Sequence, residues 1–186
     1  MMEFFTLFCD KICHFFQNPE TLHLFASNRF LLIFLVICLT HIKQSTYSSL
    51  WLCALINIPG TFLHETLHFL TGFILNSRPS GYSIFPKRSS GGYTLGNVSH
   101  KHITFYNALP TALAPLLLLV VGFYFNRWYF ANVHISYLNY IGYILLQTIF
   151  IENAIPSKTD FKVALSYPLG LVLYGLIFFF AVVLFI

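Results

Sequence analysis

The chain has 186 residues, of which 57% are hydrophobic and only 9% are charged, and its formal net charge is +4. Soluble domains carry about 25% charged residues, so this composition excludes an ordinary water-soluble globular protein and an intrinsically disordered one. The ten Lys and Arg residues are scattered among apolar runs and form no basic stripe, which excludes a nucleic-acid-binding protein. The sequence therefore predicts an integral membrane protein in contact with the lipid bilayer.

The first 23 residues form the first of two predicted units. Aromatic and aliphatic side chains recur there at helical spacing, and charged residues interrupt the run too often for a cleaved signal peptide. We expect an interfacial helix over residues 1–23 and a single transmembrane domain over residues 24–186. The four cysteines have no CxxC spacing and are expected to be small core residues: Cys9, Cys13, Cys38 and Cys53.

Five apolar stretches approach the roughly 20 residues that a membrane-spanning helix needs. They cover about residues 24–41, 49–75, 105–125, 136–155 and 165–186. The predicted fold class is therefore an all-α membrane protein with about five transmembrane helices, located as an integral multi-pass protein. Eight of the ten basic residues fall on one side of such a bundle, so the positive-inside rule predicts a cytoplasmic N-terminus and a cytoplasmic opening of the active site.

A polar loop over residues 76–104 separates the second and third apolar stretches. Residues 82–85 and 93–95 have the composition of short strands, with Gly91 and Gly92 available for a turn between them. The loop is therefore predicted to form a β-hairpin. No βα unit follows these glycines, so they do not form a phosphate-binding loop.

The residues that carry chemistry are His64-Glu65-Thr66-Leu67-His68, inside the second apolar stretch. On a helix, His64 and His68 project from one face about 6 Å apart along the axis, so that both can bind one Zn²⁺. Glu65 lies about 100° around the helix, where it can act as general base on a water molecule without being a ligand. Gly72, one turn after His68, is expected to permit close packing of a neighbouring helix there.

A catalytic zinc takes a third protein ligand, which must come from elsewhere in the chain. The expected topology returns the chain to the same side near residues 152–160, which makes Asp160 the first candidate. Glu152 is a rival, as are His100 and His102 in the polar loop.

The chain resembles the site-2 protease family of intramembrane zinc metalloproteases. The resemblance rests on HETLH at 64–68 and on Asn153-Ala-Ile-Pro156 followed by Asp160, and it covers about residues 48–165. It implies that His64, His68 and Asp160 are the zinc ligands and that Glu65 is the general base. It also implies that Asn153 lies near the active centre and helps to hold substrate. Thr159 and Phe161 replace the Leu and Gly that flank the aspartate in that family.

The function predicted is an intramembrane zinc metalloendopeptidase, a hydrolase of peptide bonds in or near transmembrane segments of membrane-protein substrates. The alternative is a non-catalytic metal-binding membrane protein, such as a transporter or a sensor. The sequence contains one HExxH motif and no second half, whereas transporters often have repeated halves.

Overall fold

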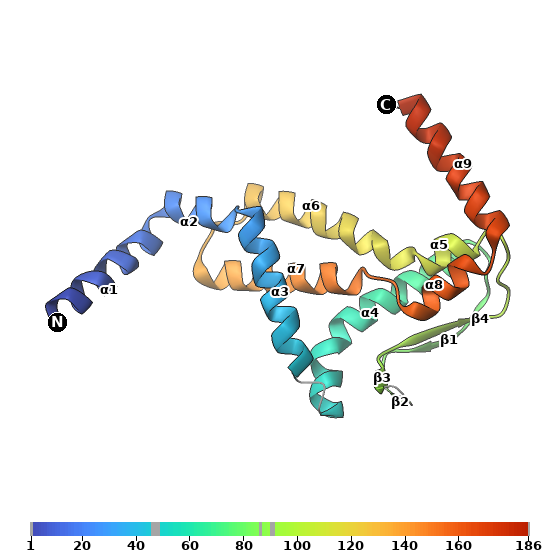
Figure 1. Ribbon diagram of the computed structural model, residues 1–186, viewed down its shortest axis with the longest axis horizontal. Helices are drawn as coiled ribbons and strands as arrows, with labels where there is room; N and C mark the ends of the chain where they lie inside the picture. Colours follow the sequence, from blue (N-terminus) through green and yellow to red (C-terminus); the bar gives the residue numbers. More distant parts are fainter. Residues whose placement is uncertain (1, 46–48, 86, 90–91, 186) are drawn as a thin grey trace.

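The computed structural model describes residues 2–45, 49–85, 87–89 and 92–185, and Figure 1 shows their arrangement. The elements in chain order are α1 (Met2–Gln17), α2 (Pro19–Ala26), α3 (Arg29–Ser45), α4 (Leu50–Ile74), β1 (Pro79–Ser83), β2 (Lys87–Ser89), β3 (Gly92–Thr94), β4 (Asn97–His100), α5 (Ala108–Ala112), the 3₁₀ turn η2 (Ala114–Leu116), α6 (Leu117–Asn132), α7 (Tyr137–Asn153), α8 (Lys158–Leu165) and α9 (Pro168–Phe185). The N-terminal stretch is helical in α1 and α2, and its interfacial position stays a prediction.

The helices fall into two groups along the long axis of the molecule. α6 and α7 lie side by side and α3 crosses them, while α4, α5, α8 and the strands gather at one end (Figure 1). α1 and α9 extend away from these groups in different directions. The end that contains α4, α5 and α8 is therefore where segments from distant parts of the sequence meet.

The core between α3, α6 and α7 is built from aromatic rings. Tyr129 and Tyr143 stack with their ring centroids 4.4 Å apart, and Ile144 packs beside them. In the same interface the Gln147 side chain donates a hydrogen bond of 2.9 Å to the carbonyl of Gly122. This core fixes α7, whose C-terminal end reaches the site described below.

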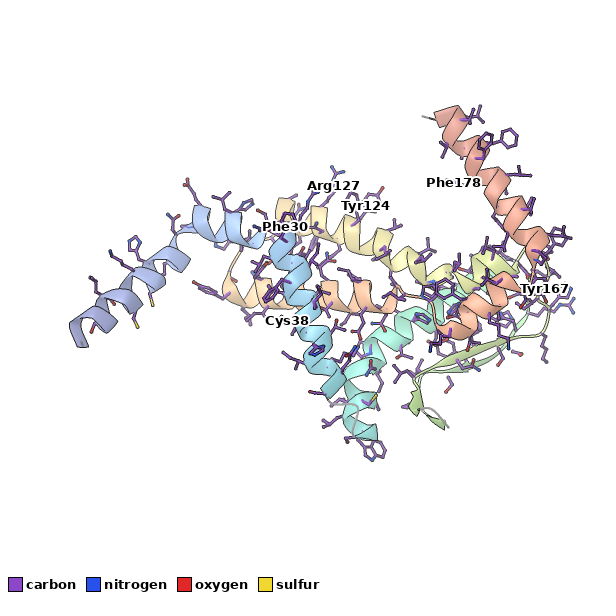
Figure 2. All side chains as sticks on the ribbon, viewed as in Figure 1. Phe30, Cys38, Tyr124, Arg127, Tyr167 and Phe178 are labelled. Carbon is purple, nitrogen blue, oxygen red and sulfur yellow. The ribbon has the colours of Figure 1, made fainter. Side chains whose placement is uncertain are left out.

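Many large apolar side chains remain exposed. Figure 2 shows Phe178 on the projecting α9, and its side chain is 72% exposed. Phe30 on α3 and Tyr124 on α6 are 85% and 64% exposed. Soluble domains usually bury large apolar side chains of this kind.

The number of membrane spans differs from the expectation. By length and composition, one described helix, Ala114–Asn132, could cross a membrane, and a second candidate arises only if α8 and α9, bent by 88°, form one span. α3 and α7 have 17 residues each, below the roughly 20 that a span needs, and α4 carries polar side chains at His64, Glu65 and His68. The predicted fold class of an all-α protein with about five transmembrane helices is therefore wrong, as is the multi-pass location. The cytoplasmic placement of the N-terminus and of the active-site opening loses its basis, because it depended on that count.

The polar loop contains two short antiparallel ladders. β1 pairs with β4, with Tyr82 opposite Val98, and β2 pairs with β3, with Lys87 opposite Thr94. The strands extend further than the sequence pattern indicated, because polar residues 97–100 form the partner of β1. The predicted turn at Gly91 lies outside the described residues.

Candidate metal centre

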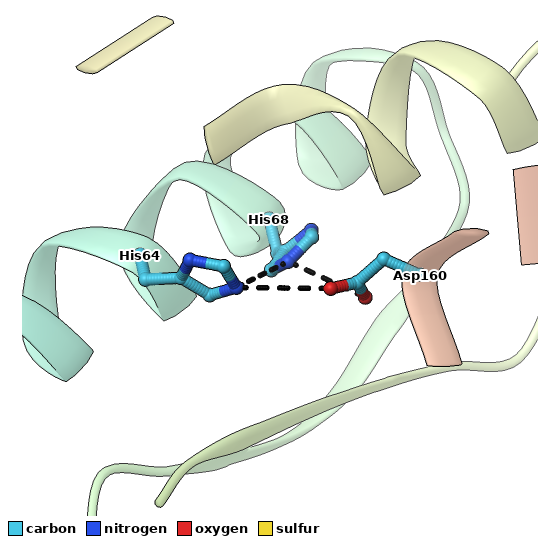
Figure 3. Close-up of side chains that lie close together, drawn as sticks. All are labelled: His64, His68 and Asp160. Carbon is cyan, nitrogen blue, oxygen red and sulfur yellow. Dashed lines mark hydrogen bonds and ion pairs between the residues drawn. The ribbon is translucent and has the colours of Figure 1, made fainter. Parts of the chain in front are cut away.

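His64 and His68 lie one turn apart on α4, and their rings face each other. The two Nε2 atoms are 3.1 Å apart (Figure 3). His64 Nδ1 lies 2.7 Å from the carbonyl of Asn153, and His68 Nδ1 lies 2.8 Å from the carbonyl of Thr111. A carbonyl oxygen only accepts hydrogen bonds, so both Nδ1 atoms must donate. Each neutral ring then presents an unprotonated Nε2, and the two lone pairs converge on one point.

Asp160 completes this cluster from the first turn of α8. Its Oδ2 lies 3.7 Å from His64 Nε2, and its Oδ1 lies 3.5 Å from His68 Nε2 (Figure 3). A tetrahedral zinc with bonds of about 2.0–2.1 Å separates its ligand atoms by about 3.3–3.4 Å, close to these distances. The donor set therefore fits one divalent cation, which would also relieve the repulsion between the two lone pairs.

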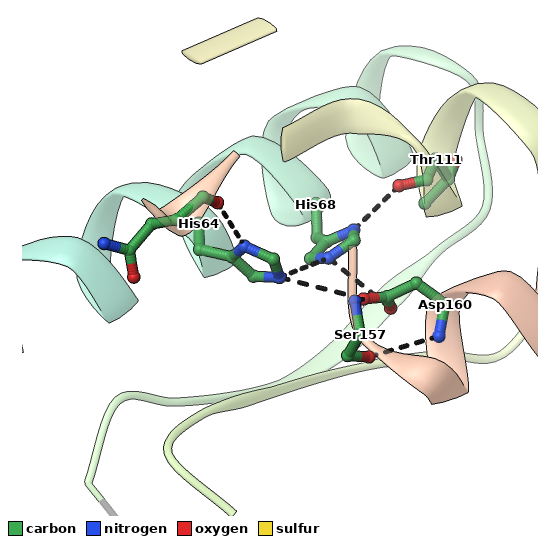
Figure 4. Close-up of polar contacts among 6 residues, drawn as sticks. His64, His68, Thr111, Ser157 and Asp160 are labelled. Carbon is green, nitrogen blue, oxygen red and sulfur yellow. Dashed lines mark hydrogen bonds and ion pairs between the residues drawn. The ribbon is translucent and has the colours of Figure 1, made fainter. Parts of the chain in front are cut away.

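The position of Asp160 follows from local sequence. Ser157 is the N-cap of α8, and its side-chain oxygen accepts from the backbone N–H of Asp160 at 3.2 Å. In return the Ser157 backbone N–H donates to Asp160 Oδ2 at 2.7 Å, which completes a capping box (Figure 4). The carboxylate is thereby held at the helix end, with Oδ2 near His64 and Oδ1 near His68.

Glu65 lies beside the cluster without belonging to it. Its side chain is only 7% exposed, and burial raises the pKa of its carboxyl, against the opposing effect of His64 and His68. Gly96 is packed against it, since a Cβ at residue 96 would come within 2.6 Å of Glu65 Oε1. A buried carboxyl whose pKa is shifted toward neutrality suits a general base.

The other candidates for the third ligand do not belong to the cluster of His64, His68 and Asp160 and make contacts of their own. Glu152 pairs with Lys43, with 2.8 Å between Oε2 and Nζ. His102 is exposed, and its Nδ1 lies 3.4 Å from the main-chain carbonyl oxygen of Asn76. His100 bonds to Ser77, and burial lowers its pKa. Among the described residues, the group of three metal-ligating side chains is His64, His68 and Asp160.

Asn153 lies near the cluster, although its visible role differs from the predicted one. Its main-chain carbonyl holds His64, and its side-chain amide packs against Gly60 and donates to the Ile149 carbonyl at 2.9 Å. The carbonyls of Asn153 and Thr111 both orient a histidine. Sequence reasoning missed these two contacts, because a main-chain carbonyl leaves no signature in residue type.

A cavity of about 730 Å³ adjoins the cluster. It is lined by His64, Glu65, His68 and Asp160, and also by residues 95–98, the segment just before and within β4. Comparison with protein-family models, with curated proteins and with solved structures gives no match for this chain. The chemistry of the site must therefore be inferred from its own geometry, which is that of a candidate metal centre on the wall of a cavity.

Proposed function

We propose that this chain is a zinc metalloendopeptidase that hydrolyses peptide bonds in or near transmembrane segments of membrane-protein substrates. The observation that carries the proposal is the convergence of two Nε2 lone pairs and one carboxylate beside a cavity. Two histidines and one carboxylate, with a fourth position free for water, are typical of catalytic zinc. The resemblance to site-2 proteases supports the same roles for His64, His68, Asp160 and Glu65.

The chemistry follows from the residues around the cavity. Zinc held by three protein ligands lowers the pKa of a water molecule toward about 7 and polarises a carbonyl group. Glu65, on the cavity wall beside His64, accepts a proton from the water as its oxygen bonds to the peptide carbonyl carbon. Glu65 then donates that proton to the amide nitrogen as the C–N bond breaks, which leaves a carboxylic acid and an amine.

The strand segment that lines the cavity favours a peptide as the substrate. Within the described residues, β4 pairs on one edge with β1, and the stretch from Leu95 to Val98 lines the cavity. An extended peptide can add to such an edge through main-chain hydrogen bonds. Asn153 also lines this cavity, and the resemblance to site-2 proteases implies that it helps to hold the peptide.

The exposed apolar surface supports a membrane-protein substrate and contact with the lipid bilayer. Leu138 on α7 and Leu169 on α9 are 80% and 70% exposed. Exposed apolar surfaces of this kind favour binding to lipid or to apolar segments of other proteins. The candidate span Ala114–Asn132 offers one segment for attachment to a bilayer.

The test compares purified wild type with Glu65→Gln, and with Glu20→Gln as a control on the exposed α2. Each protein is reconstituted in liposomes with single-span substrate proteins, and new N-termini are identified by mass spectrometry. Wild type and Glu20→Gln should cleave, whereas Glu65→Gln should not, and all three should hold about one zinc ion per chain. Cleavage by Glu65→Gln would contradict the role of Glu65. Zinc binding without cleavage by wild type would favour the non-catalytic alternative.

A further inference from the structure

His100 extends the row of imidazoles along α4, although it comes from the strand β4. Pairing of β4 with β1 sets His100 opposite Pro79, just after the end of α4. There its ring lies on Gly72, because a Cβ at residue 72 would come within 2.8 Å of His100 Nδ1. Gly72 is one turn beyond His68, so the ring of His100 occupies the space that a third side chain in the row would fill.

Ser77 fixes the orientation and the tautomer of this ring. Ser77 is fully buried, and its hydroxyl donates to the carbonyl of Gly72 at 3.0 Å. The hydroxyl has a single hydrogen, so at the 2.7 Å contact with His100 Nδ1 its oxygen accepts and the ring nitrogen donates. In the tautomer that this arrangement favours, Nε2 of His100 is unprotonated, as in the tautomers that the carbonyls of Asn153 and Thr111 set for His64 and His68.

The free nitrogen is available to a ligand in the cavity. His100 lines the same cavity as His68 and Asp160 and is partly exposed. Within the part of the chain that the structure describes, the only hydrogen-bond partner of the ring is Ser77, on Nδ1. An unprotonated imidazole nitrogen accepts hydrogen bonds, and the donor that an extended peptide offers is its backbone N–H.

We propose that His100 is a substrate-contacting residue whose Nε2 accepts a hydrogen bond from a backbone N–H of the peptide bound beside the metal centre. This inference rests on the proposed peptidase function. Gly72 leaves space for the His100 ring, and Ser77 holds that ring by a hydrogen bond. The ring in turn binds the peptide on the side of His68 away from His64.

The experiment measures binding of two probes to the zinc-loaded full chain. Acetohydroxamate reaches only the metal, whereas the hydroxamate of Leu-Leu-Phe also extends along the cavity. His100→Ala should bind the peptide hydroxamate about three- to tenfold more weakly, the effect of one neutral hydrogen bond, with acetohydroxamate affinity and zinc content unchanged. His102→Ala is the matched control, since His102 is exposed in the same loop, and it should bind both probes as wild type does.

Two further variants guard against a folding defect. His100→Gln retains an acceptor on a side chain of similar reach and should recover part of the lost affinity. Gly72→Ala should displace the ring and reproduce the loss seen in His100→Ala. Equal binding of the peptide hydroxamate by wild type and His100→Ala would overturn the role of His100 while leaving the metal centre intact. Loss of zinc from His100→Ala would overturn it in favour of a fourth metal ligand. Failure of wild type to bind either probe would refute the proposed function itself, and the role of His100 with it.

Discussion

Replacing Gly60 by alanine tests how the end of α7 supports the metal centre. A Cβ at residue 60 would overlap the side-chain amide of Asn153, far inside van der Waals contact. The main-chain carbonyl of Asn153 accepts the 2.7 Å hydrogen bond from His64 Nδ1. Displacing Asn153 therefore weakens the group that orients a proposed zinc ligand, although Gly60 itself contacts no metal.

Gly60→Ala should change zinc affinity much more than it changes the free energy of unfolding. Gly→Ala inside a helix favours the helix by about 1 kcal/mol, while overpacking costs about 1–3 kcal/mol, so the net loss in free energy of unfolding should be at most about 2 kcal/mol. Loss of a group that orients a metal ligand typically weakens metal binding about 10- to 100-fold. Gly60→Ala should therefore weaken zinc binding by that factor, measured by competition with a chelator, with only a small change in stability.

Two further variants serve as a control and as a rescue of the effect expected for Gly60→Ala. Gly142→Ala, on α7 where a Cβ meets no described atom within 4 Å, should leave zinc affinity unchanged and raise stability by up to about 1 kcal/mol. Asn153→Ala in the Gly60→Ala background removes the clashing amide but retains the carbonyl, so it should restore zinc affinity. Wild-type zinc affinity in Gly60→Ala, or no recovery in the double variant, would show that the Asn153 carbonyl does not support zinc binding through His64.

Two other predictions concern residues around the cavity. Gly96→Ala would place a Cβ 2.6 Å from Glu65 Oε1, so the rate of peptide hydrolysis should fall about tenfold or more while zinc content is unchanged. Gly81→Ala is the control, because its Cβ would meet its nearest atom at 3.6 Å, and this variant should cleave as wild type does. Glu152→Ala should retain about one zinc ion per chain, whereas Asp160→Ala should lose it, as measured by metal analysis after dialysis. Zinc loss from Glu152→Ala alone would transfer the ligand role to that residue.

The local parts of the site could be predicted from the sequence. Helical spacing alone places His64 and His68 on one face. The prediction of Asp160 depends on the five-span topology, which the structure contradicts, and on the resemblance to site-2 proteases, so its place beside the histidines does not follow from a correct prediction of the fold. The structure brings these three residues together.

Other features depend on packing that no local pattern records. Lys43 and Glu152 pair across 109 positions, and Gly72 accepts a histidine ring from β4 where a neighbouring helix was expected. The number of spans was overestimated because apolar composition was taken as span length. The helices α3 and α7 end after 17 residues each, short of a full crossing.

X-ray absorption spectroscopy of the zinc-loaded protein tests whether His64, His68 and Asp160 bind one catalytic zinc ion. We expect two imidazole nitrogens at about 2.0–2.1 Å and carboxylate or water oxygens at about 2.0–2.2 Å from the zinc. The imidazole signal should fall by half in His64→Ala. A zinc–sulfur distance of about 2.3 Å, or a spectrum unchanged in His64→Ala, would show that these residues do not hold the zinc ion.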